Sequence, residues 1–272
     1  MAWIIRVTAM CALAGAGCSA LAETPLAVLA INKEWILQIR RKHPLASVDV
    51  NDPVYKRTQR YQGIWLRDAL KLLGTAGRPE SDLYVRFRCR DGYLPIIPVS
   101  RALSGKGLIA IRDLNAPPGQ EWQSTPTSNG ETTTPGPSYL VWVDPPGGPE
   151  EYPWPYQMLA IELVSGSEAL ADTVPEASRH GHELFVAHCL SCHSINGVGG
   201  KVGPDLNTPC SVTEYWNPGF LTRFIASASS IRAGTKMPDF RSIPEKDIQA
   251  IVGYLRYMAG HKSSGSACSQ HP

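Results

Sequence analysis

The stretch "AHCLSCHSI", residues 187–195, places two cysteines two residues apart and a histidine directly after the second. Such a cluster could bind zinc, cycle as a thiol pair or hold a haem covalently. Cys189, Cys192 and His193 fit the C-x-x-C-H pattern of covalent haem attachment. The two thiols would add to the two vinyl groups on one porphyrin edge, and the adjacent histidine could reach the iron from the proximal face. We therefore expect Cys189 and Cys192 to anchor one haem c and His193 to be a metal ligand.

The two other interpretations need surroundings that this stretch lacks. Zinc takes four ligands, and no second C-x-x-C or H-x3-H pattern lies nearby to complete the set. A thioredoxin-like thiol pair is typical of a βαβ unit, whereas this motif ends a predicted helix in an all-α segment. The sequence therefore favours haem over both.

The ligand on the opposite face of the iron has several candidates in this region: Met237, Met258, His180, His182, His188 and His261. His182 and His188 lie on the predicted helix that leads into the motif, and we expect them to face solvent. Met258 falls on the apolar face of the last predicted helix, which indicates a core position. Met237 lies in a loop between Gly234 and Pro238 that can fold back over the porphyrin. We therefore predict Met237 as the distal ligand, which would give the His/Met pair that raises the haem potential.

Three segments resemble those of class I monohaem cytochromes c: "GHELFVAHCLSCHSINGVGGKVGPDL" (181–206), "KMPDF" (236–240) and "IVGYLRYMAG" (251–260). The resemblance implies an all-α cytochrome c domain at residues 178–262. It also implies that Gly181 and Phe185 let the first helix cross the last one near Tyr254. The carbonyl of Pro204 would accept a hydrogen bond from the proximal histidine, which fixes the ring and strengthens the ligand. With both axial positions filled by protein, the expected chemistry is electron transfer through the haem edge.

The N-terminus is typical of a cleavable signal peptide at residues 1–22. Arg6 is followed by a run rich in Ala, Leu, Gly and Cys, and residues 20–22 form an A-x-A cleavage site. We therefore expect a periplasmic mature protein. In a competing interpretation Cys18 is acylated, although residues 15–17 lack the large aliphatic residue usual before a lipoprotein cysteine. Membrane attachment is expected only in that case, because no other apolar run approaches the ~18–20 residues of a spanning helix.

Cleavage would leave Cys89, Cys189, Cys192, Cys210 and Cys268. Unpaired thiols tend to form disulfides in an oxidising compartment, so Cys210 and Cys268 are the natural pair if the other two hold haem. Cys89 would then be a buried, inert thiol. The formal net charge of +2 gives no sign of a nucleic-acid partner. We expect a redox protein partner or a membrane or periplasmic oxidoreductase complex.

Composition divides the mature chain into two domains, with a linker at residues 166–177 and a C-terminal tail at 263–272. The first domain, residues 23–165, has one clear helical segment, "GIWLRDALKLLG" (63–74). It also has short extended runs: "LAVLAI", "LYVRFRC", "YLPIIPV", "LIAIRD", "YLVWVD" and "LAIELV". This order predicts an α+β, mostly β domain, followed by the all-α domain.

Three stretches of the first domain resemble the sulfite-oxidase-type molybdopterin domain: "YQGIWLRDALKLLG", "YVRFRCRDGYLPIIPVSRAL" and "YPWPYQMLAIELVSG". In that family a molybdenum-ligating cysteine precedes the tyrosine-glycine helix, but this chain has no cysteine from Thr24 to Arg88. We therefore expect no molybdopterin and read Cys89 as a core residue. The alternating Arg86, Arg88 and Arg90 could form an anion pocket, although a solvated or partner-docking strand face is the simpler interpretation.

These observations predict a periplasmic electron-transfer protein or subunit without a substrate of its own and without catalytic residues. Its first domain would dock the cytochrome domain onto a redox partner. The alternative is a haem-containing oxidoreductase whose first domain binds a cofactor or a small anionic substrate. A third possibility is a sensor in which the first domain binds an anion and the haem reports it.

Overall fold

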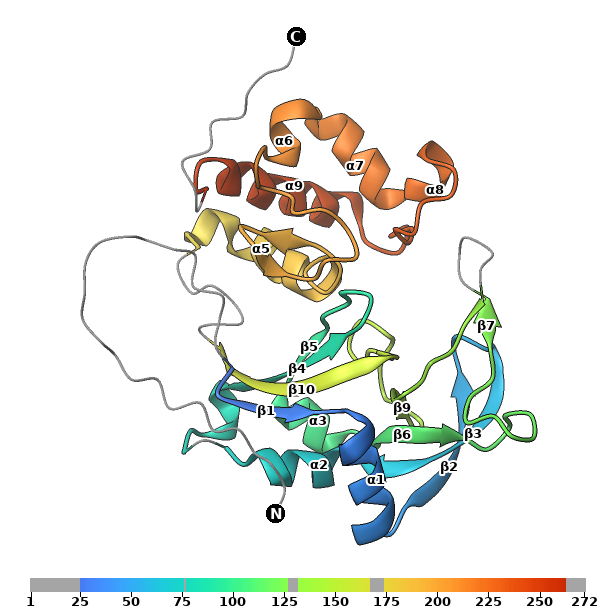
Figure 1. Cartoon of the computed structure of the whole chain (residues 1–272). Helices are drawn as coiled ribbons and strands as arrows, with labels where there is room; N and C mark the ends of the chain where they lie inside the picture. Colours follow the sequence, from blue (N-terminus) through green and yellow to red (C-terminus); the bar gives the residue numbers. More distant parts are fainter. Residues whose placement is uncertain (1–24, 76, 127–131, 167–173, 263–272) are drawn as a thin grey trace. The chain divides into compact units, whose positions relative to one another are not determined.

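The computed structural model describes residues 25–75, 77–126, 132–166 and 174–262. They divide into two compact units, residues 25–166 and residues 174–262. The first is β-rich and the second is helical, in agreement with the predicted succession of fold classes (Figure 1). The predicted signal peptide, Cys18, residues 167–173 of the predicted linker and the predicted tail lie outside the described residues. No helix within the described ranges is both long and apolar enough to cross a bilayer.

One antiparallel sheet of the first unit has the strand order β1-β10-β4-β5. These strands span Ala27–Ala30, Met158–Ser165, Leu83–Cys89 and Ile96–Pro98. Along β4, the residues Leu83, Val85, Phe87 and Cys89 are buried and alternate with more exposed ones. This period of two is the pattern of a strand with one face on a core. All four strands fall where the sequence predicts extended runs.

The second sheet has the order β2-β3-β6-β9 and is also antiparallel. These strands span Ala46–Asp52, Arg57–Trp65, Gly107–Asp113 and Tyr139–Trp142. Every residue of β9 is buried, and β6 is buried except at Arg112. The shorter strands β7 (Thr125–Pro126) and β8 (Thr132–Thr133) pair with each other.

The helices of the first unit are α1 (Lys33–Lys42), α2 (Leu66–Leu73) and α3 (Val99–Ser104), with the 3-10 turn η1 at Glu80–Asp82. Helix α2 corrects one prediction, because residues 63–65 of the predicted helix belong to strand β3. There Ile64 pairs with Ile109, and a Cβ on Gly63 would lie 2.0 Å from the Ile109 carbonyl oxygen. Strand pairing therefore holds the chain extended up to Trp65. The helix ends at Gly74, as predicted, with a φ of 68°.

The second unit is organised around α5 (Glu176–His188) and α9 (Glu245–Ala259). Gly181 lies where the two helices cross, since a Cβ on it would be 2.1 Å from the Ala250 carbonyl oxygen. The rings of Phe185 and Tyr254 lie 5.4 Å apart at the same crossing. The crossing implied by the cytochrome c resemblance is thus confirmed, and a larger residue than glycine would force the helices apart.

Three shorter helices complete this unit, α6 (Val212–Tyr215), α7 (Pro218–Ala226) and α8 (Ala228–Ile231). Asn217 caps α7 by accepting a hydrogen bond from the Phe220 N–H at 2.8 Å. Leu221 and Ile225 of α7 are buried in the same cluster as Phe185 of α5 and Leu255 of α9. The strands β11 (Ser194–Ile195) and β12 (Val198–Gly199) follow the C-x-x-C-H motif directly.

Candidate functional site

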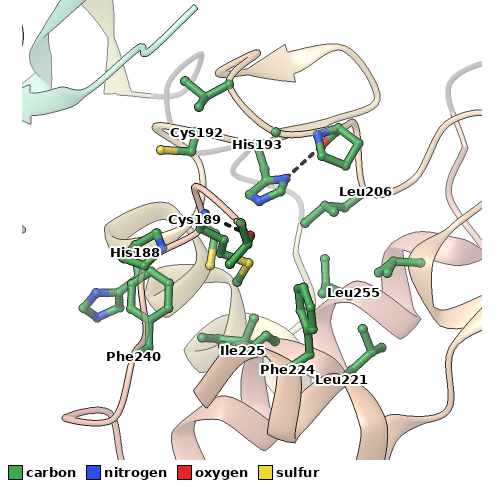
Figure 2. Close-up of a pocket in the computed structure, with 18 of the residues that line it drawn as sticks. His188, Cys189, Cys192, His193, Leu206, Leu221, Phe224, Ile225, Phe240 and Leu255 are labelled. Carbon is green, nitrogen blue, oxygen red and sulfur yellow. Dashed lines mark hydrogen bonds between the residues drawn. The ribbon is translucent and has the colours of Figure 1, made fainter. Parts of the chain in front are cut away.

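The second unit contains a cavity of about 390 Å³ whose lining includes Cys189, Cys192, His193 and Met237. The rest of its lining is mainly apolar, and Figure 2 labels Leu206, Leu221, Phe224, Ile225, Phe240 and Leu255 among it. The cavity therefore brings together the four residues that the sequence predicts as haem anchors and iron ligands, and it gives them apolar surroundings.

The two thiols lie just beyond the end of α5. Cys189 is its C-cap residue and is buried, and its N–H donates to the Phe185 carbonyl at 2.8 Å; Cys192 is half-buried. Neither forms a disulfide within the part of the chain that the structure describes. Burial, followed by the neighbouring Cys192, raises the pKa of Cys189 to about 12. A protonated thiol is a poor nucleophile and a poor zinc ligand, so this environment does not suit a redox pair or a thiolate metal site.

His193 points into the cavity with one ring edge held by the chain (Figure 2). Its Nδ1 lies 2.9 Å from the Pro204 carbonyl oxygen. That oxygen can only accept, so Nδ1 carries the proton and Nε2 keeps its lone pair. Burial lowers the pKa of His193, although the Pro204 hydrogen bond and Asp205 oppose this shift. A neutral imidazole with a free Nε2 is the form that ligates a metal.

Glycines allow the loop after the motif to lie against the histidine. A Cβ on Gly203 would lie between 2.3 and 2.8 Å from three atoms of the His193 ring. A Cβ on Gly200 would lie 2.1 Å from the Ser191 carbonyl oxygen. Any side chain at either position would push the loop away, and the Pro204 carbonyl with it. The glycine-rich run is therefore part of how the histidine is oriented.

The other methionine and histidine candidates lie in different surroundings. Met237 is half-buried and lines the cavity, whereas Met258 packs against the core cluster. His180 Nε2 is hydrogen-bonded to Asp247 Oδ1 at 2.9 Å, and His261 stacks on Tyr257 with ring centroids 4.1 Å apart. Of the two candidate methionines, Met237 is thus the one that lines the cavity.

The prediction that His182 and His188 face solvent is wrong. His182 is 8% exposed, and its ring lies 5.1 Å from that of Tyr254 at the α5–α9 crossing. His188 lines the cavity, with its ring 6.1 Å from that of Phe240. Both lie on the inner face of α5 because the helix is covered by α9 on one side and by the loop after Met237 on another. The sequence pattern alone did not reveal the second contact.

Two cations that the sequence analysis missed also line the cavity, Arg232 and Lys236, and no Asp or Glu of the described residues does so. Both lie in the loop that leads to Met237. Haem carries two carboxylates, and arginine and lysine are the side chains that pair with such groups. Among the described residues no group of three or more His, Cys, Asp or Glu could hold a metal ion. Two thiols, the imidazole of His193 with its free Nε2, a thioether, apolar walls and two cations together fit haem.

Comparison with known proteins agrees with this chemistry. Residues 176–255 match the family described as cytochrome C oxidase, cbb3-type, subunit III. A cytochrome c oxidase subunit 2 of Alkalihalophilus pseudofirmus (strain ATCC BAA-2126 / JCM 17055 / OF4) is 26% identical over 149 residues, which cover 46% of this chain and 44% of that protein. The chain thus spans less than half the length of this relative.

The second unit is therefore a cytochrome c-type domain. Such a domain implies haem binding and supports a role in haem-based electron transfer. The similarity of residues 49–166 to sulfite-oxidase-type domains stays a prediction.

The remaining predicted positions of the first unit are structural in character. Cys89 is buried at 4% exposure, and burial raises the pKa of its thiol far above the usual range. Arg86 and Arg88 pair with the buried Glu162 of β10, at 2.8 and 3.0 Å. Two of the three arginines are thus engaged by a carboxylate within the sheet, which argues against an anion pocket there. Cys210 is disulfide-bonded, while Cys268, its predicted partner, lies outside the described residues.

Proposed function

We propose that this chain is a periplasmic c-type cytochrome that passes single electrons to or from a redox protein through a His/Met-ligated haem. The observation that carries the proposal is the cavity into which His193 points, flanked by Cys189 and Cys192 and lined by Met237. When bound, haem would supply a one-electron couple at its iron. The protein would supply attachment, axial ligands and an apolar enclosure.

Attachment would use the thiols of Cys189 and Cys192. Each S–H would add across one vinyl C=C, so that a C–S bond and a C–H bond form, with no leaving group and no external oxidant. His193, one residue beyond Cys192, would then meet the iron with Nε2 because Nδ1 is engaged by Pro204.

Met237 would be the second protein ligand to the iron. Its loop is held locally, since the Met237 N–H donates to Thr235 Oγ1 at 3.2 Å and Gly234 adopts a φ of 72°. Arg232 and Lys236 would pair with the haem carboxylates from the same loop. Apolar residues such as Leu221 and Phe224 would exclude water and keep both ligands in place.

For the first unit we propose a docking role without a molybdenum cofactor. The buried position of Cys89 supports this proposal, because a thiol enclosed in the core is not available as a metal ligand. The rival function, an oxidoreductase with a second cofactor in this unit, makes a different prediction about metal content.

The test is expression in a periplasm with the haem-attachment apparatus for c-type cytochromes, followed by fractionation, spectroscopy and elemental analysis. We expect the mature protein in the periplasmic fraction, a mass increase of one haem that survives denaturation, one iron per chain and no molybdenum. The double variant Cys189→Ala/Cys192→Ala should lose the covalent mass. Protein without a covalent haem would contradict the proposal, and stoichiometric molybdenum would support the rival.

A further inference from the structure

We infer that Asp205 is a positioning residue whose carboxylate holds the loop behind His193 and sets the haem potential through its negative charge. The inference rests on the proposed function, because it concerns the potential of a haem bound in this cavity. Asp205 does not itself line the cavity, but its neighbours Pro204 and Leu206 do.

The carboxylate of Asp205 joins the two chain segments that frame His193. One oxygen, Oδ2, accepts from Ser194 Oγ at 2.9 Å and from the Gly197 N–H at 2.7 Å. The other, Oδ1, accepts from the backbone N–H groups of Asn207 and Thr208, each at 2.8 Å. Ser194 directly follows the proximal histidine, and Asp205 directly follows the proline that orients its ring. One side chain therefore fixes the residues on both sides of the His193–Pro204 hydrogen bond.

Further hydrogen bonds connect the loop around Asp205 to the end of helix α9. Asn207 is fully buried, and its Nδ2 donates to Asn196 Oδ1 at 2.8 Å and to the Met258 carbonyl at 2.7 Å. Asn196 Nδ2 in turn donates to the His261 carbonyl at 2.7 Å. Because α9 forms part of the core, these bonds leave the Asp205 carboxylate little freedom to move away from the histidine.

Within the described ranges, no cation contacts the Asp205 carboxylate directly. Its partners are neutral hydroxyl or backbone N–H groups, whereas Asp239 and Glu214 of the same unit contact Arg241 and Lys262. Burial would raise the pKa of Asp205, but the hydrogen bonds from Gly197, Asn207, Ser194 and Thr208 together lower it. The group is thus a carboxylate at neutral pH. A fixed negative charge next to the ligand favours the oxidised state, which carries one more positive charge.

The experiment compares the reduction potentials of the haem-loaded full chain and three variants. Asp205→Asn removes the charge and keeps the size. Ser194→Ala removes one hydrogen bond and keeps the charge. Asp247→Asn removes an equal charge from the first turn of α9, where Asp247 pairs with His180. We expect Asp205→Asn to raise the ratio of reduced to oxidised protein at a fixed poise about threefold, about 30 mV at 59 mV per tenfold.

Ser194→Ala and Asp247→Asn should each change the ratio of reduced to oxidised protein by less than half of the change expected for Asp205→Asn. Ser194→Ala should in addition lower the melting temperature, because it removes a hydrogen bond to the Asp205 carboxylate. A purely structural role would instead lower the stability of Asp205→Asn and leave its potential at the wild-type value, which would overturn the inference. If Asp247→Asn shifted the reduction potential as much as Asp205→Asn, the inference would also be overturned, because the shift would then follow from the net charge of the protein and not from the position of Asp205.

If Asp205→Asn does not load haem, Thr208→Lys tests the same point. It leaves the carboxylate and its hydrogen-bonding groups in place and adds a cation next to them, so the potential should again rise. An unchanged potential in Thr208→Lys would contradict the inference. Failure of the wild-type chain to bind haem would instead contradict the proposed function, so the two failures are distinguishable.

Discussion

Gly181 of α5 lies so close to the backbone of α9 that a Cβ on it would be 2.1 Å from the Ala250 carbonyl oxygen. This approach brings the first and last helices of the cytochrome c-type domain into direct backbone contact. It also places Phe185, one turn later, against Tyr254 and beneath the cavity.

Replacement of Gly181 by Ala should therefore destabilise the domain. Alanine favours a helix by about 1 kcal/mol over glycine, but overpacking at this crossing should cost about 2–3 kcal/mol and win. The expected result is a lower denaturant midpoint with an unchanged slope, measured by urea unfolding. Gly253→Ala on α9 is the matched control, since nothing lies within 4 Å of a Cβ there and stability should rise. Equal stability of Gly181→Ala and wild type would mean that the helices do not meet as described.

Met237→Ala should change the iron ligation without unfolding the domain. Loss of the thioether would remove the proposed distal ligand, so the haem should become high-spin and its potential should fall. Absorption spectra and a redox titration measure both effects. Met258→Ala is the control, because Met258 packs against the core cluster and should affect stability alone. A low-spin spectrum and wild-type potential in Met237→Ala would exclude this methionine as the ligand.

Glu162→Ala should be among the most damaging substitutions in the first unit. Glu162 is 5% exposed and pairs with Arg86 at 2.8 Å, so its removal leaves a largely buried guanidinium without its carboxylate. Breaking such a pair costs about 3–5 kcal/mol. Thermal unfolding of the full chain should show an earlier transition for the first unit, while the haem spectrum is retained. Asp68→Ala, which removes the exposed pair with Lys71, should change stability by less than about 0.5 kcal/mol. If the first unit of Glu162→Ala unfolded at the same temperature as that of Asp68→Ala, the pair between Glu162 and Arg86 would not stabilise the unit as we expect.

Glu214→Gln should make stability less dependent on pH in the acid range. The hydrogen bond from Lys262 lowers the pKa of Glu214 from the ordinary value of 4.5, and burial opposes this while the Ser211 N–H assists. A depressed folded pKa means that the stabilisation is present above about pH 4.5 and is lost as the pH falls through the folded value. The stabilities of wild type and Glu214→Gln should therefore differ at pH 7 and converge as the pH falls through the folded pKa of Glu214. If the difference in stability between wild type and Glu214→Gln stayed constant over this pH range, the charge of the Glu214 carboxylate would not be involved.

Much of the second unit could be predicted because its signals are local. The C-x-x-C-H motif and the loop between Gly234 and Pro238 that carries Met237 each depend on a few neighbouring residues. The burial of His182 and the cavity contact of His188 could not be predicted from the sequence, because they depend on which elements cover α5 after folding. The same holds for Arg232 and Lys236, since only the fold of their loop brings them to the cavity. Asp205 lies in a stretch that the sequence analysis singled out, but its hydrogen-bond partners could be identified only from the structure.

In the first unit, strands with alternating or continuous apolar residues were found from sequence, whereas β2 and β3 were not. Strand β2 reads "ASVDVND", and β3 is polar through most of its length, so neither shows a strong apolar pattern. Both are fixed instead by pairing, β2 with β3 and β3 with β6. Their position is a tertiary property that local composition does not encode.

The hydrogen bond from Asn207 to the Met258 carbonyl has a consequence for the order of events during synthesis. Its partners are 51 residues apart in sequence, and Met258 lies at the end of the last described helix. In the export that we propose, the C-x-x-C-H motif therefore emerges well before the residues that finish the loop behind His193. A nascent chain in that interval has accessible thiols and no completed cavity, so haem attachment during export would precede the locking of the histidine.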